Sequence, residues 1–400
     1  MRTRREAIIG TAAIGASAAG LAGPARAQAR RDPIRIGVPT SQTGAYAVLG
    51  EEVIRGVQFA VDEANAAGGI DGRQVEFRIG DEQSNPDAAR RAAERLALGG
   101  HGLLIGAISS ASGLAIASQL DRWNALYVST VNKADRLTGE SCGRRLFRAN
   151  HSDSMDLMVV APWLRGRAER KWGICAADYV WGRDSAAGFT RAAQETGKEV
   201  ALSVFPPLGT RDYAPYISQL KAAGLQGVWV VLSGADAINF AKQARQFGLS
   251  AELTIVGHAY IVPTTLRAAG EDVVGAYGVI NYDASLDTPQ NRRFVEAWRR
   301  RFNQDPGEYE AETYTGMRLI FEGVRKAGST DPDRVSRAMN GLEFESPFGM
   351  VRMRAEDHQL VMPNLMGRVV RDGGRIHRAI EMTVPAAEAT PPPSAACRMG

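Results

Sequence analysis

The pattern that most constrains the fold of this chain is a repeated alternation of short apolar segments with longer amphipathic segments. Residues 34–38 have the pattern of a strand, and residues 51–66 that of a helix, because Val53, Val57 and Ala60 recur at helical spacing. The same succession then repeats along the chain. Strands that alternate with helices in this way predict a parallel sheet with helices on both faces.

The alternation restarts after Asn150. Strands are predicted over residues 171–176, 199–205, 227–232 and 253–256, with helices between them. Two successive units of this type predict an α/β protein made of two doubly wound lobes with parallel sheets. A ligand held between two such lobes would contact the loops at the carboxyl ends of both sheets.

Length and composition agree with two lobes and argue against some partners. Of the 400 residues, 44% are hydrophobic, which is enough for two packed cores. Much of the net charge of +4 lies at the N-terminus, where Arg2, Arg4, Arg5 and Arg26 accompany a single acidic residue, so residues 28–400 carry +1. The sequence has no basic run interleaved with aromatic residues, so we expect no binding to nucleic acid.

Residues 1–27 have the pattern of an export signal. Arg4 and Arg5 precede a weakly apolar segment over 7–21, and small residues stand at the two positions that a signal peptidase reads. The arginine pair favours the twin-arginine route, but a Phe-Leu pair does not follow it, so the general secretory route stays open. We expect a soluble periplasmic protein without a lipid anchor, because no later stretch reaches about 18 apolar residues and no cysteine lies near the cleavage site.

A serine-rich turn follows the third predicted strand. Ser109 and Ser110 lie before a helix over 114–120, where free backbone N–H groups and the helix dipole favour a carboxylate. The next strand leads to Asn132 and Lys133, which reach the same edge of the sheet if the two strands are adjacent and parallel. Two ordinary helix caps would explain these turns as well.

Short motifs along the chain carry a resemblance to a known family. They include the segments GVQFAVDEAN and GGIDG, and they lie at residues 43–44, 56–65, 68–72, 81–88, 105–110, 146–148, 178–182 and 243–248. In these motifs and their order, the chain from residue 34 to about 382 resembles the type I periplasmic solute-binding proteins of ABC transporters. The resemblance is to the branch that binds leucine, isoleucine and valine.

The resemblance implies two lobes joined by three crossing strands. It also implies a solute site that closes by hinge motion before the protein docks on a membrane permease. We place the lobes at 33–150 plus 283–352 and at 151–282 plus 353–382, followed by an extended Ala/Pro-rich tail over 383–400. We expect a monomer that binds a small solute and no cofactor.

The resemblance also suggests which residues bind the solute. The family's carboxylate-binding serine matches Ser109, with Ser110 beside it. The segment that reads Ala, Ala, Thr in amino-acid binders falls on Val131, Asn132 and Lys133. These positions are expected to form the wall contributed by the first lobe.

Aromatic positions are expected to complete the site. The family's aromatic lid matches Trp181, and a late aromatic wall residue matches Tyr309. The acidic residue that holds the ammonium group of amino acids falls near residues 257–260, where this chain has no carboxylate. Further candidates for ligand contact are Tyr46, His258 and Tyr260.

These departures predict a solute without an α-ammonium group. A buried ammonium without a partner costs several kcal/mol, and Lys133 adds a cation. We therefore expect an aromatic or short aliphatic carboxylate whose apolar body packs on Trp181 and Tyr309. An amino-acid ligand, or a ligand sensor on the same fold, stays open, as do plainer roles for Lys133 at the rim, for His258 in the structure and for Tyr309 in packing.

The three cysteines are expected to reach an oxidising compartment. Cys175 lies in an apolar strand and is predicted to be a buried free thiol. Cys142 and Cys397 lie outside regular structure, and proteins of the family that the chain resembles often end in such a cysteine. We predict that Cys142 and Cys397 form a disulfide that joins the tail to the first lobe.

The sequence predicts neither a metal site nor an enzyme. The five histidines have no metal-type spacing, and neither a nucleophile elbow nor a phosphate loop occurs. Asp81 and Glu82 are adjacent carboxylates, but adjacent strand residues point to opposite faces, so they do not form an acid-base pair.

Overall fold

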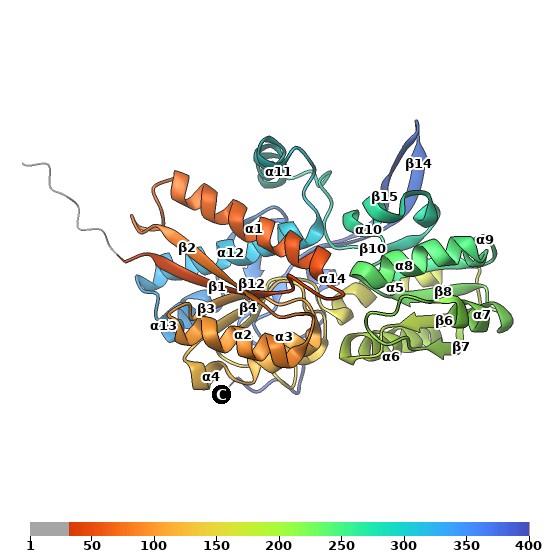
Figure 1. Ribbon diagram of the computed structural model, residues 1–400, viewed down its shortest axis with the longest axis horizontal. Helices are drawn as coiled ribbons and strands as arrows, with labels where there is room; N and C mark the ends of the chain where they lie inside the picture. Colours follow the sequence, from red (N-terminus) through yellow and green to blue (C-terminus); the bar gives the residue numbers. More distant parts are fainter. Residues whose placement is uncertain (1–31, 400) are drawn as a thin grey trace, which may run out of the picture.

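The computed structural model describes residues 32–399 and shows two α/β lobes side by side (Figure 1). The predictions for the export signal at residues 1–27 lie outside the described residues. The sheet of the first lobe is parallel, with the strand order β2-β1-β3-β4-β5. Its strands are β1 (Ile34–Thr40), β2 (Val75–Asp81), β3 (Leu103–Gly106), β4 (Leu126–Ser129) and β5 (Leu146–Arg148).

Helices cover both faces of this sheet because successive strand side chains point in opposite directions. Leu103 and Ile105 share a core with α1 (Ala47–Ala66) and α12 (Glu308–Ala327), whereas Leu104 packs against α2 on the other face. The remaining helices of this lobe are α2 (Pro86–Leu98), α3 (Ser110–Ala117), α4 (Leu120–Trp123), η1 (Asp135–Thr138), α11 (Pro289–Phe302) and α13 (Pro332–Met339).

The second lobe contains a larger, mixed sheet with the order β15-β14-β10-β9-β8-β6-β7. Its parallel strands are β6 (Lys171–Ala176), β7 (Glu199–Val204), β8 (Gly227–Val231), β9 (Thr254–His258) and β10 (Tyr277–Ile280). Its helices are α5 (Asp153–Arg165), α6 (Val180–Glu195), α7 (Ala214–Ala222), α8 (Gly234–Gln246), α9 (Leu249–Glu252), α10 (Pro263–Ala269) and η2 (Gly270–Val273). The antiparallel hairpin of β14 (Asn364–Asp372) and β15 (Arg375–Val384) was not predicted.

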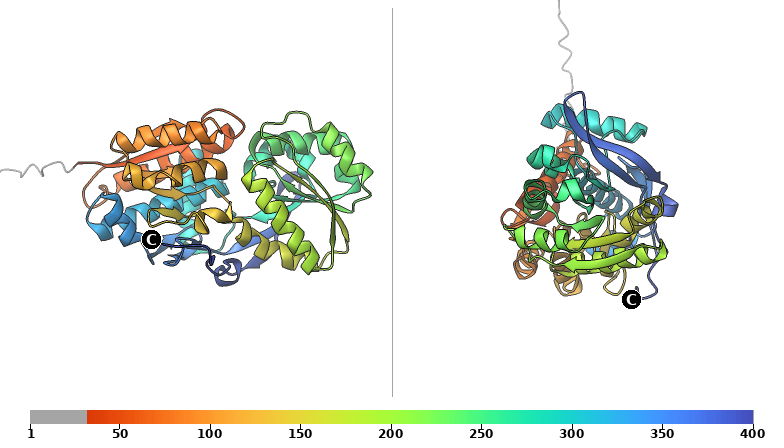
Figure 2. Two further views of the ribbon diagram at one scale, coloured as in Figure 1. Left: turned by 90° about the horizontal axis from the view of Figure 1, so that it is seen from below. Right: turned by 90° about the vertical axis from the view of Figure 1, so that its right-hand side faces the viewer.

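The chain passes between the lobes three times, namely after β5, after β10 and before β14. A small antiparallel sheet precedes the last crossing and packs with the first lobe, as in the two further views of Figure 2. Its strands are β11 (Glu343–Ser346), β12 (Gly349–Met353) and β13 (Leu360–Val361). The lobes therefore come from discontinuous parts of the sequence, and the two α/β lobes predicted from the strand-helix alternation are confirmed.

The C-terminal segment is more ordered than the expected extended tail. Residues 386–389 form the helical turn α14 (Ala386–Ala389), where Ala389 is buried and α14 packs against α5. The structure pairs Cys142 with Cys397 in a disulfide and leaves Cys175 as a buried free thiol. The tail is therefore fixed at both ends, by the contact of α14 with α5 and by the disulfide to Cys142.

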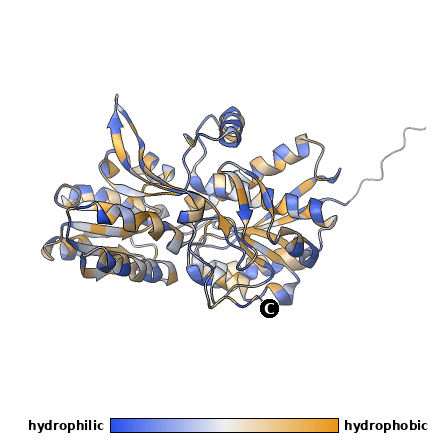
Figure 3. Ribbon diagram, turned by 180° about the vertical axis from the view of Figure 1, so that it is seen from behind, coloured by the Kyte–Doolittle hydropathy of each residue, from blue (hydrophilic) through white to orange (hydrophobic). Residues whose placement is uncertain are grey.

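Hydropathy follows the layers of the two lobes. The strands are largely apolar and the outer helix faces largely polar in Figure 3. Within residues 32–399, none of the helices has the length and apolar character that crossing a membrane requires.

Candidate functional site

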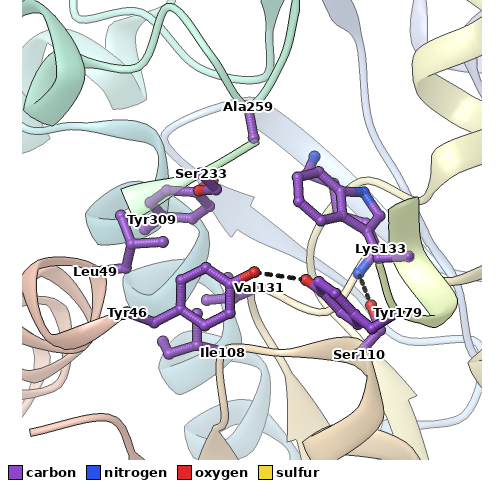
Figure 4. Close-up of a pocket in the computed structure, with 11 residues that line it drawn as sticks. Tyr46, Leu49, Ile108, Ser110, Val131, Lys133, Tyr179, Ser233, Ala259 and Tyr309 are labelled. Carbon is purple, nitrogen blue, oxygen red and sulfur yellow. Dashed lines mark hydrogen bonds between the residues drawn. The ribbon is translucent and has the colours of Figure 1, made fainter. Parts of the chain in front are cut away.

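A cavity of about 280 Å³ lies between the lobes. Both lobes contribute to its walls, and the side chains converge on it in Figure 4. The first lobe contributes Tyr46, Leu49, Ile108, Ser110, Val131, Lys133 and Tyr309. The second lobe contributes Tyr179, Trp181, Ser233 and Ala259.

The two lobes touch directly around this cavity, so the structure is in a closed form. The hydroxyls of Tyr46 and Tyr179 lie 2.8 Å apart across the cleft. The backbone N–H of Ala235 donates to the carbonyl of Ala45 at 3.2 Å, which joins the start of α8 to the start of α1. A solute therefore has to part these walls before it can be enclosed.

The two expected serines have different places in the structure. Ser109 is the N-cap of α3, and its hydroxyl accepts from the backbone N–H of Ser112 at 3.0 Å, so it does not line the cavity. Ser110 does line it. The Ser110 hydroxyl accepts from the backbone N–H groups of Lys133 and Ala134, each at 3.1 Å. Its own proton is therefore left to donate elsewhere.

Asn132 ties the two turns together from behind the wall. Its amide nitrogen donates to the carbonyls of Ala107, Ile108 and Ser109 at 2.8–3.1 Å. Its amide oxygen accepts from the hydroxyl of Tyr127 at 2.6 Å and from that of Ser129. Asn132 is fully buried and is not among the residues that line the cavity. It therefore shapes the site without reaching it.

Lys133 lines the cavity with a charge that is already paired. Its Nζ donates to Asp156 Oδ2 at 3.0 Å and to the amide oxygen of Asn281. Burial opposes ionisation of Lys133, but the carboxylates of Asp156, Glu312 and Glu308 together outweigh it, so the pKa of Lys133 is raised. Burial likewise opposes the charge on Asp156, yet Lys133 and His258 hold the pKa of Asp156 well below its usual range. The pair adds no net charge to the cavity.

His258 and Tyr260 lie outside the cavity wall. His258 Nε2 is 2.5 Å from Asp156 Oδ2, and the ring packs edge-on against Trp181 with centroids 5.3 Å apart. Burial lowers the pKa of His258. Tyr260 points into the core of the second lobe and packs against Phe240. Neither side chain is among the lining residues.

The expected aromatic residues do line the cavity. Trp181 lies in the first turn of α6, and its Nε1 donates to Asp153 Oδ1 at 3.1 Å, which fixes the indole ring. Tyr309 comes from the first turn of α12, and Tyr46 directly precedes α1. The rings thus approach the cavity from three different helix starts, as Figure 4 shows for the labelled tyrosines.

Sequence reasoning missed part of the wall and the support behind it. Tyr179 stands two positions before Trp181 in a motif that was noted, so that motif held the signal. No sequence pattern pointed to Asp156 or Asn281, which lie far from Lys133 along the chain. The missed lining residues are Leu49, Ile108, Tyr179 and Ser233, whereas Val131 and Ala259 lie in segments that the resemblance had marked.

Comparison with known proteins places the chain in a family. The model of a family described as periplasmic binding protein matches residues 33–375. The Leu/Ile/Val-binding protein homolog 8 of Brucella abortus (strain 2308) is 29% identical over 352 residues, which are 83% of this chain and 86% of that protein.

Two solved structures share the fold. A solute binding protein of an ABC transporter from Rhodopseudomonas palustris BisB5, in complex with 3,4-dihydroxy benzoic acid, has a TM-score of 0.82 at 22% identity and covers 89% of this chain and 98% of its own. A solute binding protein from R. palustris in complex with benzoate has a TM-score of 0.83 at 20% identity, with 92% and 100% covered. Since the family match spans both lobes, the chain belongs to the periplasmic binding protein family, as its motifs predicted.

Proposed function

We propose that this protein is the extracytoplasmic solute-binding component of an ABC importer, and that it captures a small organic acid without an α-ammonium group. The observation that carries this proposal is the composition of the cavity wall. The lining side chains include three tyrosines, a tryptophan and one lysine, and no carboxylate is among them. An α-amino acid would bury its ammonium group here without a free anionic partner.

Donors at one end of the cavity can hold a carboxylate. The Ser110 hydroxyl accepts two backbone N–H bonds, so its proton is left for a ligand oxygen. Lys133 uses two of its three N–H bonds on Asp156 and Asn281, which leaves one. The hydroxyl pair of Tyr46 and Tyr179 also retains one proton that it does not need for itself.

The rest of the wall suits an apolar body. Leu49, Ile108 and Val131 line the cavity between the rings of Trp181 and Tyr309. An aromatic ring or a short branched chain would bury its surface there, at roughly 25 cal/mol per Å². The benzoate and dihydroxybenzoate named for the two structural neighbours are acids of this class.

Hinge closure would couple capture to transport. A solute that contacts both lobes favours the closed form only by the free energy of contacts absent from the open form. Ser110 and Lys133 from the first lobe, and Trp181 from the second, supply such contacts. We infer that the closed monomer docks on the importer's permease and performs no catalytic step. Export by the twin-arginine route, with the general secretory route as its alternative, is part of the same proposal.

The test is isothermal titration of the purified protein with matched pairs of ligands. L-leucine and 4-methyl-2-oxopentanoate share a side chain and a carboxylate, and differ in the α-ammonium group. We expect benzoate or the oxo acid to bind and L-leucine to give no heat. Tight binding of L-leucine or L-valine, with no response to benzoate or the oxo acid, would overturn the assignment.

An amino-acid ligand is the second candidate, and the name of the Brucella relative favours it. Its ammonium group would need Asp156, the carboxylate that pairs with Lys133 behind the wall, to release Lys133. The same titration decides between the two. The membrane protein that binds the solute-bound closed form decides whether the partner is a permease or a signalling receptor.

A further inference from the structure

A buried glutamate on the first lobe meets the second lobe outside the solute cavity. Glu52 lies on α1 and its side chain is 1% exposed. Its Oε1 accepts from the hydroxyl of Thr264 and from Arg267 Nη2 at 3.2 Å, and both donors belong to α10 of the other lobe. Neither Thr264 nor Arg267 lines the solute cavity. These contacts exist only while the lobes are together.

The charges around Glu52 do not fully compensate a carboxylate. Arg55 Nη2 is 3.9 Å from Glu52, but Arg55 Nε donates to Glu310 at 2.6 Å, so this guanidinium is shared between two acids. Arg267 is about half exposed to solvent. The charged groups that face Glu52, element by element, are Arg55 on α1, Arg267 on α10 and Glu310 on α12.

The second oxygen of Glu52 makes the ionised form costly. Glu52 Oε2 is buried and has no hydrogen-bond partner among residues 32–399. Burying a carboxylate oxygen without a partner is unfavourable. Burial, reinforced by the nearby Glu310, raises the pKa of Glu52 to about 8. In the closed form this side chain therefore holds a proton near neutral pH.

We propose that lobe closure creates a proton-binding site at Glu52, so that this protein captures its solute together with a proton. The proposal rests on the hinge closure of the proposed function. When the lobes part, Thr264 and Arg267 leave Glu52 and water reaches it, so the carboxyl group ionises. A solute anion and a proton then enter the closed form together.

The direction of the pH dependence follows from the two states. An exposed glutamate has a pKa of about 4.3, and closure raises the pKa of Glu52 to about 8. Proton binding at Glu52 therefore stabilises the closed form fully below about pH 4.3, and this stabilisation is lost as the pH rises through about 8. Between pH 6 and pH 8 the affinity for a solute is expected to fall by about 50-fold.

Besides Glu52, the buried carboxyls with raised pKa values in the part of the chain that the structure describes are Glu82, Glu308, Asp153 and Asp236. The first two have to be separated from Glu52, because their pKa values lie near 7. Burial raises the pKa of Glu82 to about 7, but its partners Ser41 and Ile108 lie in the same lobe, so closure leaves it unchanged. Burial also raises the pKa of Glu308 to about 7, and Glu308 faces Arg378 of the second lobe. A glutamine at position 52 isolates the contribution of Glu52 from both.

The experiment measures benzoate affinity from pH 6 to pH 8 by calorimetry, in buffers of different ionisation enthalpy. The native protein should lose affinity as the pH rises and take up a proton on binding near pH 6.5. Glu52→Gln keeps the shape and the Thr264 contact of a protonated carboxyl, so it should bind at both pH values and take up no proton at this site. Glu51→Gln, at the exposed neighbouring position, is the matched control and should behave like the native protein.

The proposal would be overturned if the benzoate affinity of Glu52→Gln fell with pH by more than half the native slope. It would also be overturned if the native protein took up no proton on binding.

If benzoate does not bind at any pH, the assignment of the solute fails, and lobe closure is then measured without a ligand. Nitroxide labels on Arg91→Cys and Gln194→Cys, exposed positions on α2 and α6, report the distance between the lobes. In the native protein the population of the closed form should rise as the pH falls from 8 to 6, and in Glu52→Gln it should stay constant. The same change of the closed population in both proteins would reject the proton site.

Discussion

The charge that Lys133 contributes to the cavity depends on its partner Asp156. A lysine at this position adds a cation to the wall, but Asp156 lies 3.0 Å from its Nζ and balances the charge. A solute anion therefore meets a neutral pair, and its affinity depends on hydrogen-bond donors such as the Ser110 hydroxyl. Single residues also decide whether the lobes can meet, and Gly234 is the clearest case.

Gly234→Ala should block closure. Gly234 begins α8 with a φ of +60°, and a Cβ there would lie 2.8 Å from the carbonyl of Ala45 in the other lobe. We expect the benzoate affinity to fall at least about tenfold, because a lobe contact of this kind cannot form around the added methyl group. Calorimetry measures the affinity, and thermal melting without solute measures the fold.

Gly209→Ala is the matched control for this prediction. Gly209 also has a positive φ, of +85°, but no atom lies within 4 Å of its added Cβ. It carries the same backbone strain without the clash. Equal affinity losses in the two variants would show that strain alone, and not the contact between lobes, explains the effect.

At the scale of elements, the site depends on two turns that follow neighbouring parallel strands. The turn after β3 carries Ile108 and Ser110, and the turn after β4 carries Val131 and Lys133. Glu82, directly after β2, also accepts from the backbone N–H of Ile108 at 2.9 Å. Buried polar side chains thus hold loops that would otherwise be free to move.

Asn132→Ala should lower both stability and affinity. The variant removes the amide that bonds three carbonyls of the first turn and two hydroxyls of β4. We expect the free energy of unfolding to fall by about 2–4 kcal/mol, measured by urea denaturation, and the affinity for benzoate to fall with it because Ser110 loses its position.

Asn65→Ala supplies the comparison in the same lobe. The Asn65 amide bonds the backbone of Val75 in both directions, and neither residue lines the cavity. This variant should lower stability by about 1–2 kcal/mol and leave the affinity unchanged. If Asn132→Ala also left the affinity unchanged, the hydrogen bonds of Asn132 would contribute to folding only.

At the scale of the whole molecule, the C-terminal tail joins the lobes a fourth time. β15 belongs to the sheet of the second lobe, α14 packs on α5, and the tail then reaches the first lobe at Cys142. Between α14 and the disulfide, the Nη1 of Arg354 donates to the carbonyl of Pro391 at 2.6 Å, which holds the tail in place. The disulfide therefore closes a covalent loop around the three crossings.

Removal of this disulfide should lower stability in a redox-dependent way. The bridge spans 255 residues of sequence, so it restricts the unfolded chain strongly, and its loss should cost about 2–5 kcal/mol. Urea denaturation with and without reductant should differ for the native protein and not for the Cys142→Ser/Cys397→Ser variant. A thiol count of three in the denatured protein before any reduction would contradict the pairing.

The architecture could be predicted from local patterns of the sequence. The apolar periods of two and of 3.6 residues set the alternation of strands and helices, and parallel strands joined by helices can form only a covered sheet. Asn85 caps α2 and Pro86 is its first residue, which is a local sequence signal of a helix start. Ser110 was found because it stands in a turn between a strand and a helix, and Trp181 and Tyr309 because they match positions of the family that the chain resembles. These signals are contained within a few residues of chain.

The site could not be completed in this way, because its remaining parts depend on distant segments. Ser109 and Ser110 look alike in sequence, and only the three-dimensional course of the turn decides that one caps α3 and the other faces the cavity. The partner of Lys133 lies across the cleft, and the proton site at Glu52 needs Thr264 and Arg267 from a helix more than 200 residues away. Local sequence determined which elements form, whereas the packing of two lobes decided which charges are neutralised, because burial and pairing are properties of neighbours in space.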